Sequence, residues 1–310
     1  MRAAGVGSMP GSDYAQALRI VIEETPHLIA LPELPNRGAE STMMGRALGM
    51  LEGIGADIAQ GYWRIVDRPG RDQLRAERLL REDLEFAEEQ LHDFSGEVKV
   101  AVCGPLTLAA VTNLPRGDRV LADLGALRDL AGSLSAGFTN YLKRVRRALP
   151  DAKVIVQVDE PGMQGVLGGM IPTSSKFSVY PPVDIQLARE LLALFAADVV
   201  HTCTPSVPVP LLVEVGVSAI SFDMNLATPD DFWAEAIEGG VAIWPGIVQV
   251  GDDRHPDQYA DSVRAFFGQL GFASVPKSTV ITPTCGLAGF SELQAARALQ
   301  TATKTVGAIT

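Results

Sequence analysis

The chain has 310 residues, of which 47% are hydrophobic and 20% charged, so it can bury a large core. Its formal net charge of −11 argues against nucleic acid or an anionic membrane as the main partner, because either would require a basic face. No apolar run approaches the roughly 20 residues of a membrane helix, and the opening MRAAGVGSMPGS does not have the pattern of a secretory signal.

Eight short apolar runs, each followed by turn residues and then a helical pattern, recur along the whole chain. They occupy residues 3–6, 27–34, 98–105, 152–161, 198–203, 217–223, 241–249 and 278–285. Most are continuously apolar, as in parallel strands that are covered on both faces. Eight βα units favour a closed barrel over an open sheet, and the glycine fingerprint of a dinucleotide fold is missing. We therefore predict an α/β fold, a single (β/α)8 TIM-barrel domain spanning residues 1–310.

Residues 55–97 lie between the second and third predicted strands and are longer than a simple connection requires. They include the strongly charged RDQLRAERLLREDLEFAEEQLHDF, whose apolar positions recur every three or four residues. We expect an extra helical insertion here, with one solvated face.

Chemistry in such a barrel lies at the C-terminal ends of the strands, so the residues that end each run matter most. Six of the eight ends carry a side chain that can bind a metal or move a proton. The ends are Gly7-Ser8, Glu33, Cys103, Asp159-Glu160, His201-Thr202-Cys203, Asp223, Gln249 and Cys285.

His201 and Cys203 are two residues apart, so their side chains point the same way from an extended strand. Asp223 ends the next strand and Cys285 the last, and in a closed barrel these ends face one mouth. One imidazole, two thiolates and one carboxylate form a tetrahedral set suited to Zn²⁺, and soft sulfur disfavours magnesium or calcium. Taken singly, each residue is as easily explained as a buried or hydrogen-bonded strand end.

The chain has only three cysteines, widely spaced, which is no disulfide framework and favours a reducing, cytoplasmic setting. The third, Cys103 in AVCGPLT, is expected to be structural, in the core or a pocket wall.

The stretches HTC (201–203), SFD (221–223) and TPTCGL (282–287) resemble the zinc motifs of the catalytic domain of cobalamin-independent methionine synthase. GVGSMPG is similar to the IGSFP opening of that family, and VQVDEPGM to its QIDEPA strand. The motifs keep the family's order and span the chain from Ser8 to Cys285.

The resemblance implies transfer of a methyl group to the thiol of homocysteine, a small-molecule substrate, to give methionine. It implies that His201, Cys203, Asp223 and Cys285 bind zinc. It also implies that Ser8 contacts the carboxylate of the substrate and that Asp159 holds the ammonium group, while Glu160 contributes to binding or orients the loop.

Two departures from the family concern the metal and the methyl donor. Asp223 stands where the family has glutamate, one methylene longer. Gly251 stands where the family has a catalytic histidine after the seventh strand, and His255, four residues later, is a weak substitute. The resemblance also places the first apolar run at the first strand of the catalytic barrel, so we expect a single barrel without the second one that helps to hold polyglutamated folate in the family. The expected donor is therefore open, and a donor protein carrying a corrinoid is an alternative to methylfolate.

Other functions remain open from the sequence. A corrinoid-dependent methyltransferase acting on another thiol is one alternative. A uroporphyrinogen-decarboxylase-like barrel would need a basic cluster, for which Arg37 and Arg64 are the candidates. A barrel that binds zinc or a small ligand without turnover, as a partner subunit, is the non-enzymatic alternative.

Overall fold

Eight parallel strands form the wall of a barrel in the computed structural model, which describes residues 1–310. Their order is β1–β10–β9–β8–β7–β6–β5–β2. The strands are β1 (Arg2–Ala3), β2 (Leu28–Ala30), β5 (Glu97–Cys103), β6 (Lys153–Asp159), β7 (Val199–Thr202), β8 (Ala219–Asp223), β9 (Ala242–Val248) and β10 (Val280–Pro283). Each overlaps one of the eight predicted runs, so the predicted α/β barrel is confirmed.

The barrel closes between the segments that follow β1 and β2. Ser8 and Glu33 form a parallel bridge there: Met9 N donates to Glu33 O at 2.8 Å, and Glu33 N donates to Gly7 O at 3.2 Å. Closure therefore brings Ser8 and Glu33 side by side at the C-terminal end of the barrel.

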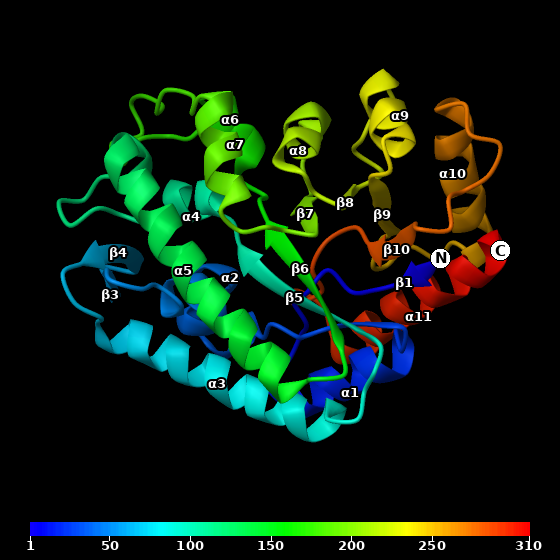
Figure 1. Cartoon of the computed structure of the whole chain (residues 1–310), viewed down its shortest axis with the longest axis horizontal. Helices are drawn as coiled ribbons and strands as arrows, with labels where there is room; N and C mark the ends of the chain where they lie inside the picture. Colours follow the sequence, from blue (N-terminus) through cyan, green and yellow to red (C-terminus); the bar gives the residue numbers. More distant parts are fainter.

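Helices surround the strands, and the two chain termini lie close together beside β1 and α11 (Figure 1). Asp side chains cap α1, α5, α7 and α9 by accepting hydrogen bonds from the first turn. The α-helices are α1 (Tyr14–Glu24), α2 (Met43–Gly49), α3 (Arg71–Leu91), α4 (Pro105–Val111), α5 (Leu124–Ala148), α6 (Met163–Leu167), α7 (Ile185–Ala193), α8 (Val209–Val215), α9 (Asp231–Glu238), α10 (Pro256–Gln269) and α11 (Glu292–Ile309). Short 3-10 turns occupy Pro35–Arg37, Ala39–Ser41 and Val120–Ala122.

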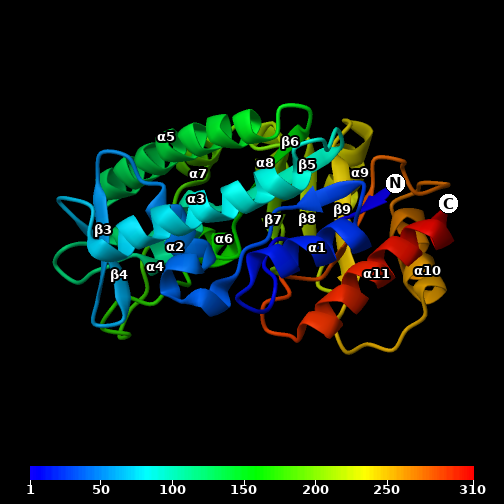
Figure 2. The same ribbon diagram turned by 90° about the horizontal axis from the view of Figure 1, so that it is seen from below.

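The insertion after the second strand is only partly helical. Residues 55–66 form an antiparallel hairpin of β3 (Gly55–Ala59) and β4 (Tyr62–Val66), which lies at the end of the molecule far from the termini (Figure 2). Its two-residue turn has positive φ at both Gln60 and Gly61, as a type I′ turn requires. The charged α3 contacts α1, α2 and α5, so it belongs to the outer helix layer. The extra helix predicted in this segment is α3, and the hairpin over residues 55–66 is a feature that the sequence analysis did not predict.

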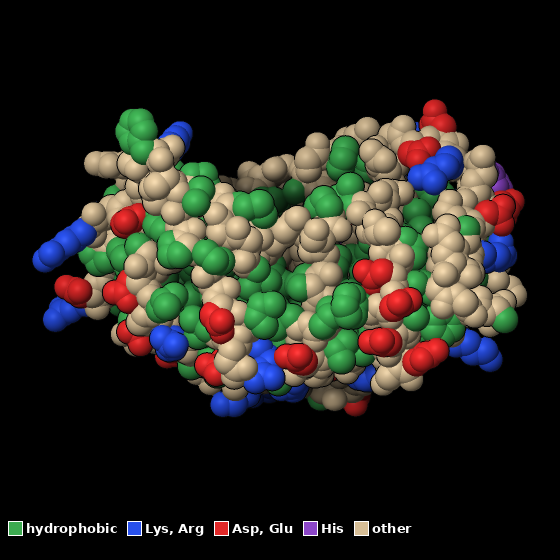
Figure 3. All heavy atoms as spheres, turned by 90° about the horizontal axis from the view of Figure 1, so that it is seen from above, with side chains coloured by type: hydrophobic (Ala, Val, Ile, Leu, Met, Phe, Trp, Pro, Cys, Tyr) green, Lys and Arg blue, Asp and Glu red, His purple; other side chains and the backbone are tan.

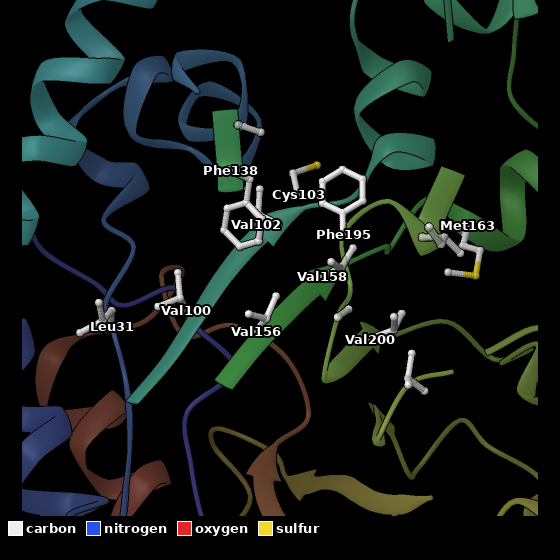
Figure 4. Close-up of a cluster of buried hydrophobic side chains, with 14 of the residues drawn as sticks. Leu31, Val100, Val102, Cys103, Phe138, Val156, Val158, Met163, Phe195 and Val200 are labelled. Atoms are coloured by element: carbon white, nitrogen blue, oxygen red, sulfur yellow. The ribbon is translucent and has the colours of Figure 1, made fainter. Parts of the chain in front are cut away.

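The main core lies between the strands and the helices. Val100 and Val102 of β5, together with Val156 and Val158 of β6, pack against Phe138 of α5 and its neighbours (Figure 4). Cys103, fully buried, belongs to this cluster, so its prediction as a core residue is confirmed. A smaller apolar cluster fills the barrel itself: Ala4, Leu28, Ile155, Val199, Ala219, Trp244 and Val280.

Charged groups are mixed on the surface. On the face in Figure 3, Lys and Arg side chains lie mostly near the edge and are interspersed with Asp and Glu, while apolar side chains gather toward the middle. None of the helices combines the length and apolarity required to cross a membrane.

Candidate active site at the C-terminal end of the barrel

The inward side chains change from apolar to polar along the strands. On β6 the alternate positions are Ile155, Gln157 and Asp159, and on β7 they are Val199 and His201. Strand register places Asp159 beside His201, and His201 beside Ser221 of β8. The apolar cluster therefore forms a floor, above which the polar side chains meet.

His201, Cys203 and Cys285 are brought together from β7 and from the loop after β10. Their ligating atoms all lie within 4.8 Å of one another, and the two sulfurs are 3.7 Å apart. Two thiolates on one tetrahedral zinc ion, each about 2.3 Å from the metal, are separated by roughly 3.8 Å. The sulfur spacing therefore fits a shared zinc ion.

The imidazole of His201 is oriented as metal-binding histidines commonly are. Its Nδ1 lies 2.9 Å from Ser221 Oγ, while its Nε2 is buried without any hydrogen-bond partner. A hydrogen bond to one ring nitrogen fixes the tautomer that leaves the other free to bind a metal. The unpartnered Nε2 is the atom of this site that most clearly needs a ligand.

The pKa values of the two neighbouring thiols shift in opposite directions. The neighbouring Cys203 thiol and the nearby His201 imidazole lower the pKa of Cys285 well below its usual range. The pKa of Cys203 is raised, chiefly because its proton is held on the Cys285 sulfur. Cys203 is half-buried and Cys285 is exposed, so the site opens to solvent. Catalytic zinc sites keep one such open position.

Asp223, the fourth predicted ligand, ends β8 next to this group without joining it. Its Oδ1 accepts hydrogen bonds from Asn225 N at 2.9 Å and from Asn225 Nδ2 at 3.2 Å. Partial burial raises the pKa of Asp223, and the nearby Cys285 and His201 also influence it. The carboxylate is thus near enough to interact electrostatically with both residues, and its role as a ligand stays a prediction.

A cavity of about 370 Å³ adjoins the cysteines and the histidine. Ser8, predicted to meet a substrate carboxylate, and Asp159, predicted to hold an ammonium group, both line it. The remaining lining is largely small or apolar: Val6, Gly7, Pro35, Thr42, Met43, Met44, Pro161, Gly286, Ala288 and Gly289, together with Glu33.

Two buried carboxylates therefore face this cavity. Burial raises the pKa of Asp159, while the charges of His201 and Lys99 oppose the shift. Burial likewise raises the pKa of Glu33 to about 7, against the neighbouring Arg46 guanidinium, whose Nε lies 3.3 Å from Glu33 Oε1. Both groups sit where a cationic ligand would favour the ionised form.

Glu160 is fully buried and does not line the cavity. Its carboxylate accepts hydrogen bonds from Leu106 N at 2.9 Å, Thr107 N at 2.7 Å and Thr107 Oγ1 at 2.5 Å. It thus binds the first turn of α4, where backbone N–H groups are otherwise unpaired. Gly104 is required beside it, because a Cβ there would lie 2.2 Å from Glu160 Oε1. Of the two roles expected for Glu160, this geometry supports orienting the loop.

Comparison with known proteins adds one finding at the level of structure. The chain is similar to a solved structure of a B12-independent methionine synthase from Shewanella sp. W3-18-1 in complex with selenomethionine. The match covers 99% of this chain and 96% of the methionine synthase chain, with a TM-score of 0.63. The chain has the fold of this methionine synthase. The sequence identity is 14%, and neither a protein-family profile nor the sequence of a curated protein matches the chain. The resemblance inferred from the motifs is thus confirmed for the fold.

His255 lies away from the cavity lining, contrary to its expected catalytic place. It caps α10: its side chain accepts a hydrogen bond from the first turn, and Gln258 reciprocates on the His255 backbone. The side chain is 72% exposed and lies 3.0 Å from Asp257. Gly251 has a φ of +87° with open space around it, in the turn after β9.

The arginines that a decarboxylase would require are engaged elsewhere. Arg37 forms a bidentate pair with the buried Asp83, both distances being 2.7 Å, and Arg64 lies on the β4 hairpin. Neither arginine lines the cavity, and no other Lys or Arg does so. The chemistry of the lining therefore disfavours a substrate with several carboxylates.

Glu33, Met43 and Met44 were not predicted as site residues. Glu33 ends the second strand, so its position at a strand end was the available signal. Met43 and Met44 begin α2, before the insertion, where methionines resemble ordinary core residues.

Proposed function

We propose that this protein is a zinc-dependent methyltransferase that methylates the thiol of homocysteine and forms methionine. The observation that carries the proposal is the buried, unpartnered Nε2 of His201 beside two sulfurs 3.7 Å apart, on a cavity with two carboxylates. The methionine synthase of similar fold was solved in complex with selenomethionine, an amino acid of the same chemical class as the proposed product.

The proposed zinc ligands are His201, Cys203 and Cys285, with Asp223 as the fourth. This set would contain a neutral imidazole, two thiolates and one carboxylate. Zinc bound to it would form a site with a net formal charge of −1. A zinc ion in this set would lower the pKa of an incoming thiol so that it is a thiolate near neutral pH. Both hydrogen bonds from Asn225 are accepted by Asp223 Oδ1, so Oδ2 would be the oxygen that approaches and binds the ion.

The other end of the substrate would be held by the cavity wall. An ammonium group fits between Asp159 and Glu33, the two carboxylates of the lining, and its charge would keep both ionised. The hydroxyl or backbone N–H of Ser8 would receive the carboxylate. These contacts orient the sulfur for in-line attack on a methyl carbon, a reaction that depends on positioning more than on proton transfer.

The donor is proposed to be a methyl-corrinoid carried by a partner protein. In the transfer, a bond forms between sulfur and the methyl carbon, the bond from the methyl carbon to the donor breaks, and the thiol has already lost its proton. A folate leaving group must be protonated on nitrogen, but Gly251 carries no acid and His255 caps α10. A corrinoid leaves with the electron pair on its metal and requires no proton.

The test is methionine formation by the zinc-loaded protein from L-homocysteine, with methylcobalamin or monoglutamyl methylfolate as donor. We expect product with methylcobalamin and little with methylfolate. Rapid turnover with methylfolate alone would contradict the proposed donor. Failure with both donors, together with no homocysteine binding, would contradict the proposed function.

A further inference from the structure

Lys99 is a cation buried inside the barrel without a carboxylate partner. It lies on β5, is 1% exposed and forms no ion pair. Its Nζ donates to Gly5 O at 2.7 Å, Val6 O at 2.7 Å and Gln157 Oε1 at 2.6 Å. All three of its protons are therefore used on neutral oxygens, while the carboxylates of Asp159 and Glu33 act on its charge without contacting it. Burial lowers the pKa of Lys99 to about 8.

This ammonium determines which way the amide of Gln157 faces. Lys99 has only donors, so it requires the oxygen of Gln157 and turns the nitrogen to the opposite side. There Gln157 Nε2 donates to Asp159 Oδ1 at 2.7 Å and to Val6 O at 2.9 Å. With the amide reversed, its oxygen would face the Asp159 carboxylate and its NH2 group would face the ammonium.

The orientation of the Gln157 amide affects both predicted substrate contacts, Asp159 and Ser8. Asp159 is held through Oδ1, while its other oxygen has no hydrogen-bond partner in the protein and the residue lines the cavity. Val6 O receives hydrogen bonds from both Lys99 and Gln157, immediately before the Gly7–Ser8 turn. One buried network thus connects the segment that carries Ser8 to the side chain of Asp159.

We propose that Lys99 is a positioning residue for amino-acid recognition, which acts through Gln157 to hold Asp159 as an acceptor for the substrate ammonium group. This role rests on the proposed function, because it takes a thiol amino acid as the ligand. It makes recognition of the ammonium group separable from recognition of the thiol, which occurs at the His201 and cysteine end of the cavity.

The test compares L-homocysteine with 4-mercaptobutyrate, which is the same thiol acid without the amino group. Calorimetry on zinc-loaded protein gives a dissociation constant for each ligand, and their ratio measures recognition of the ammonium group. Lys99→Met should reduce this ratio by about tenfold or more while binding of 4-mercaptobutyrate changes little. In an Asp159→Asn background, Lys99→Met should change the ratio no further, because the two residues act in series.

Ile155→Val is the matched control, since Ile155 lies opposite Lys99 in the strand register and only core volume is lost. It should leave the ratio unchanged. If Lys99→Met does not fold, Gln157→Met takes its place in the test. It removes the amide that contacts Asp159 and should reduce the ratio in the same way. Equal weakening of both ligands, or an unchanged ratio, would overturn the positioning role alone. A wild-type protein that does not distinguish the two ligands would overturn the proposed amino-acid function and this role with it.

Discussion

Glu160→Gln should make the stability of the barrel less dependent on pH. In the folded protein, burial raises the pKa of Glu160 to about 7, although hydrogen bonds from Thr107 and Leu106 oppose the shift. The folded state therefore holds the proton more tightly than the unfolded chain. The stability that this proton contributes is fully present below the unfolded pKa of about 4.5 and is lost as pH rises through about 7.

The magnitude follows from these two values. Linkage lowers the free energy of unfolding by about 1 kcal/mol at about pH 5.5 and by about 3 kcal/mol at about pH 8, a difference of about 2 kcal/mol. Glutamine has no such titration. It leaves one buried N–H of α4 unpaired, which costs about 1–3 kcal/mol at every pH. The free energy of unfolding of Glu160→Gln is therefore lower than that of wild type, and this difference should shrink by about 2 kcal/mol from about pH 5.5 to about pH 8.

Urea unfolding of wild type and Glu160→Gln at both pH values measures the difference, and the comparison cancels the other titrating groups. Glu88→Gln, at an exposed position of α3, is the control and should show no change in its deficit with pH. A deficit for Glu160→Gln that stays constant or grows with pH would refute the inference that Glu160 is protonated below neutral pH.

Three further substitutions test individual residues. Gly286→Ala places a Cβ 2.0 Å from Ser8 Oγ, so the hydroxyl must move, and calorimetry should show about three- to tenfold weaker homocysteine binding with unchanged zinc content. His255→Ala should cost about 1 kcal/mol in urea unfolding through loss of the α10 cap; a fall in the methyl-transfer rate beyond that explained by unfolding would restore its expected catalytic role. Asp223→Ala should lower zinc affinity, measured against a chelator, by at least about tenfold, and an unchanged affinity would remove Asp223 from the ligand set.

The barrel and the metal-binding group could be predicted because both depend on short-range patterns. Most strands are largely apolar runs, and His201 and Cys203 are two residues apart at the end of a single strand. Parallel topology then brings Cys285 to the same end, although it lies 82 residues from Cys203. Once the eight strands were assigned, this grouping required only the closed barrel.

The other features depend on contacts that no local pattern encodes. The hairpin at residues 55–66 is specified by pairing across a two-residue turn, within a segment whose charged second half is helical. Glu33 and Asp159 line one cavity because β2 and β6 flank β5 in the sheet, an order that the sequence of neither strand encodes. Lys99 and Gln157 are 58 residues apart, and in sequence each resembles an isolated polar residue in an apolar strand.

The central claim is that His201, Cys203 and Cys285 hold a zinc ion, and zinc content per chain tests it most directly. Protein purified under reducing conditions should contain about one zinc ion per chain. Cys285→Ala should lose most of it, whereas Cys103→Ala, which removes a buried thiol outside the group, should retain it. Wild-type protein that contains no zinc and cannot be loaded with it, or a Cys285→Ala variant that binds zinc as well as wild type, would contradict the account.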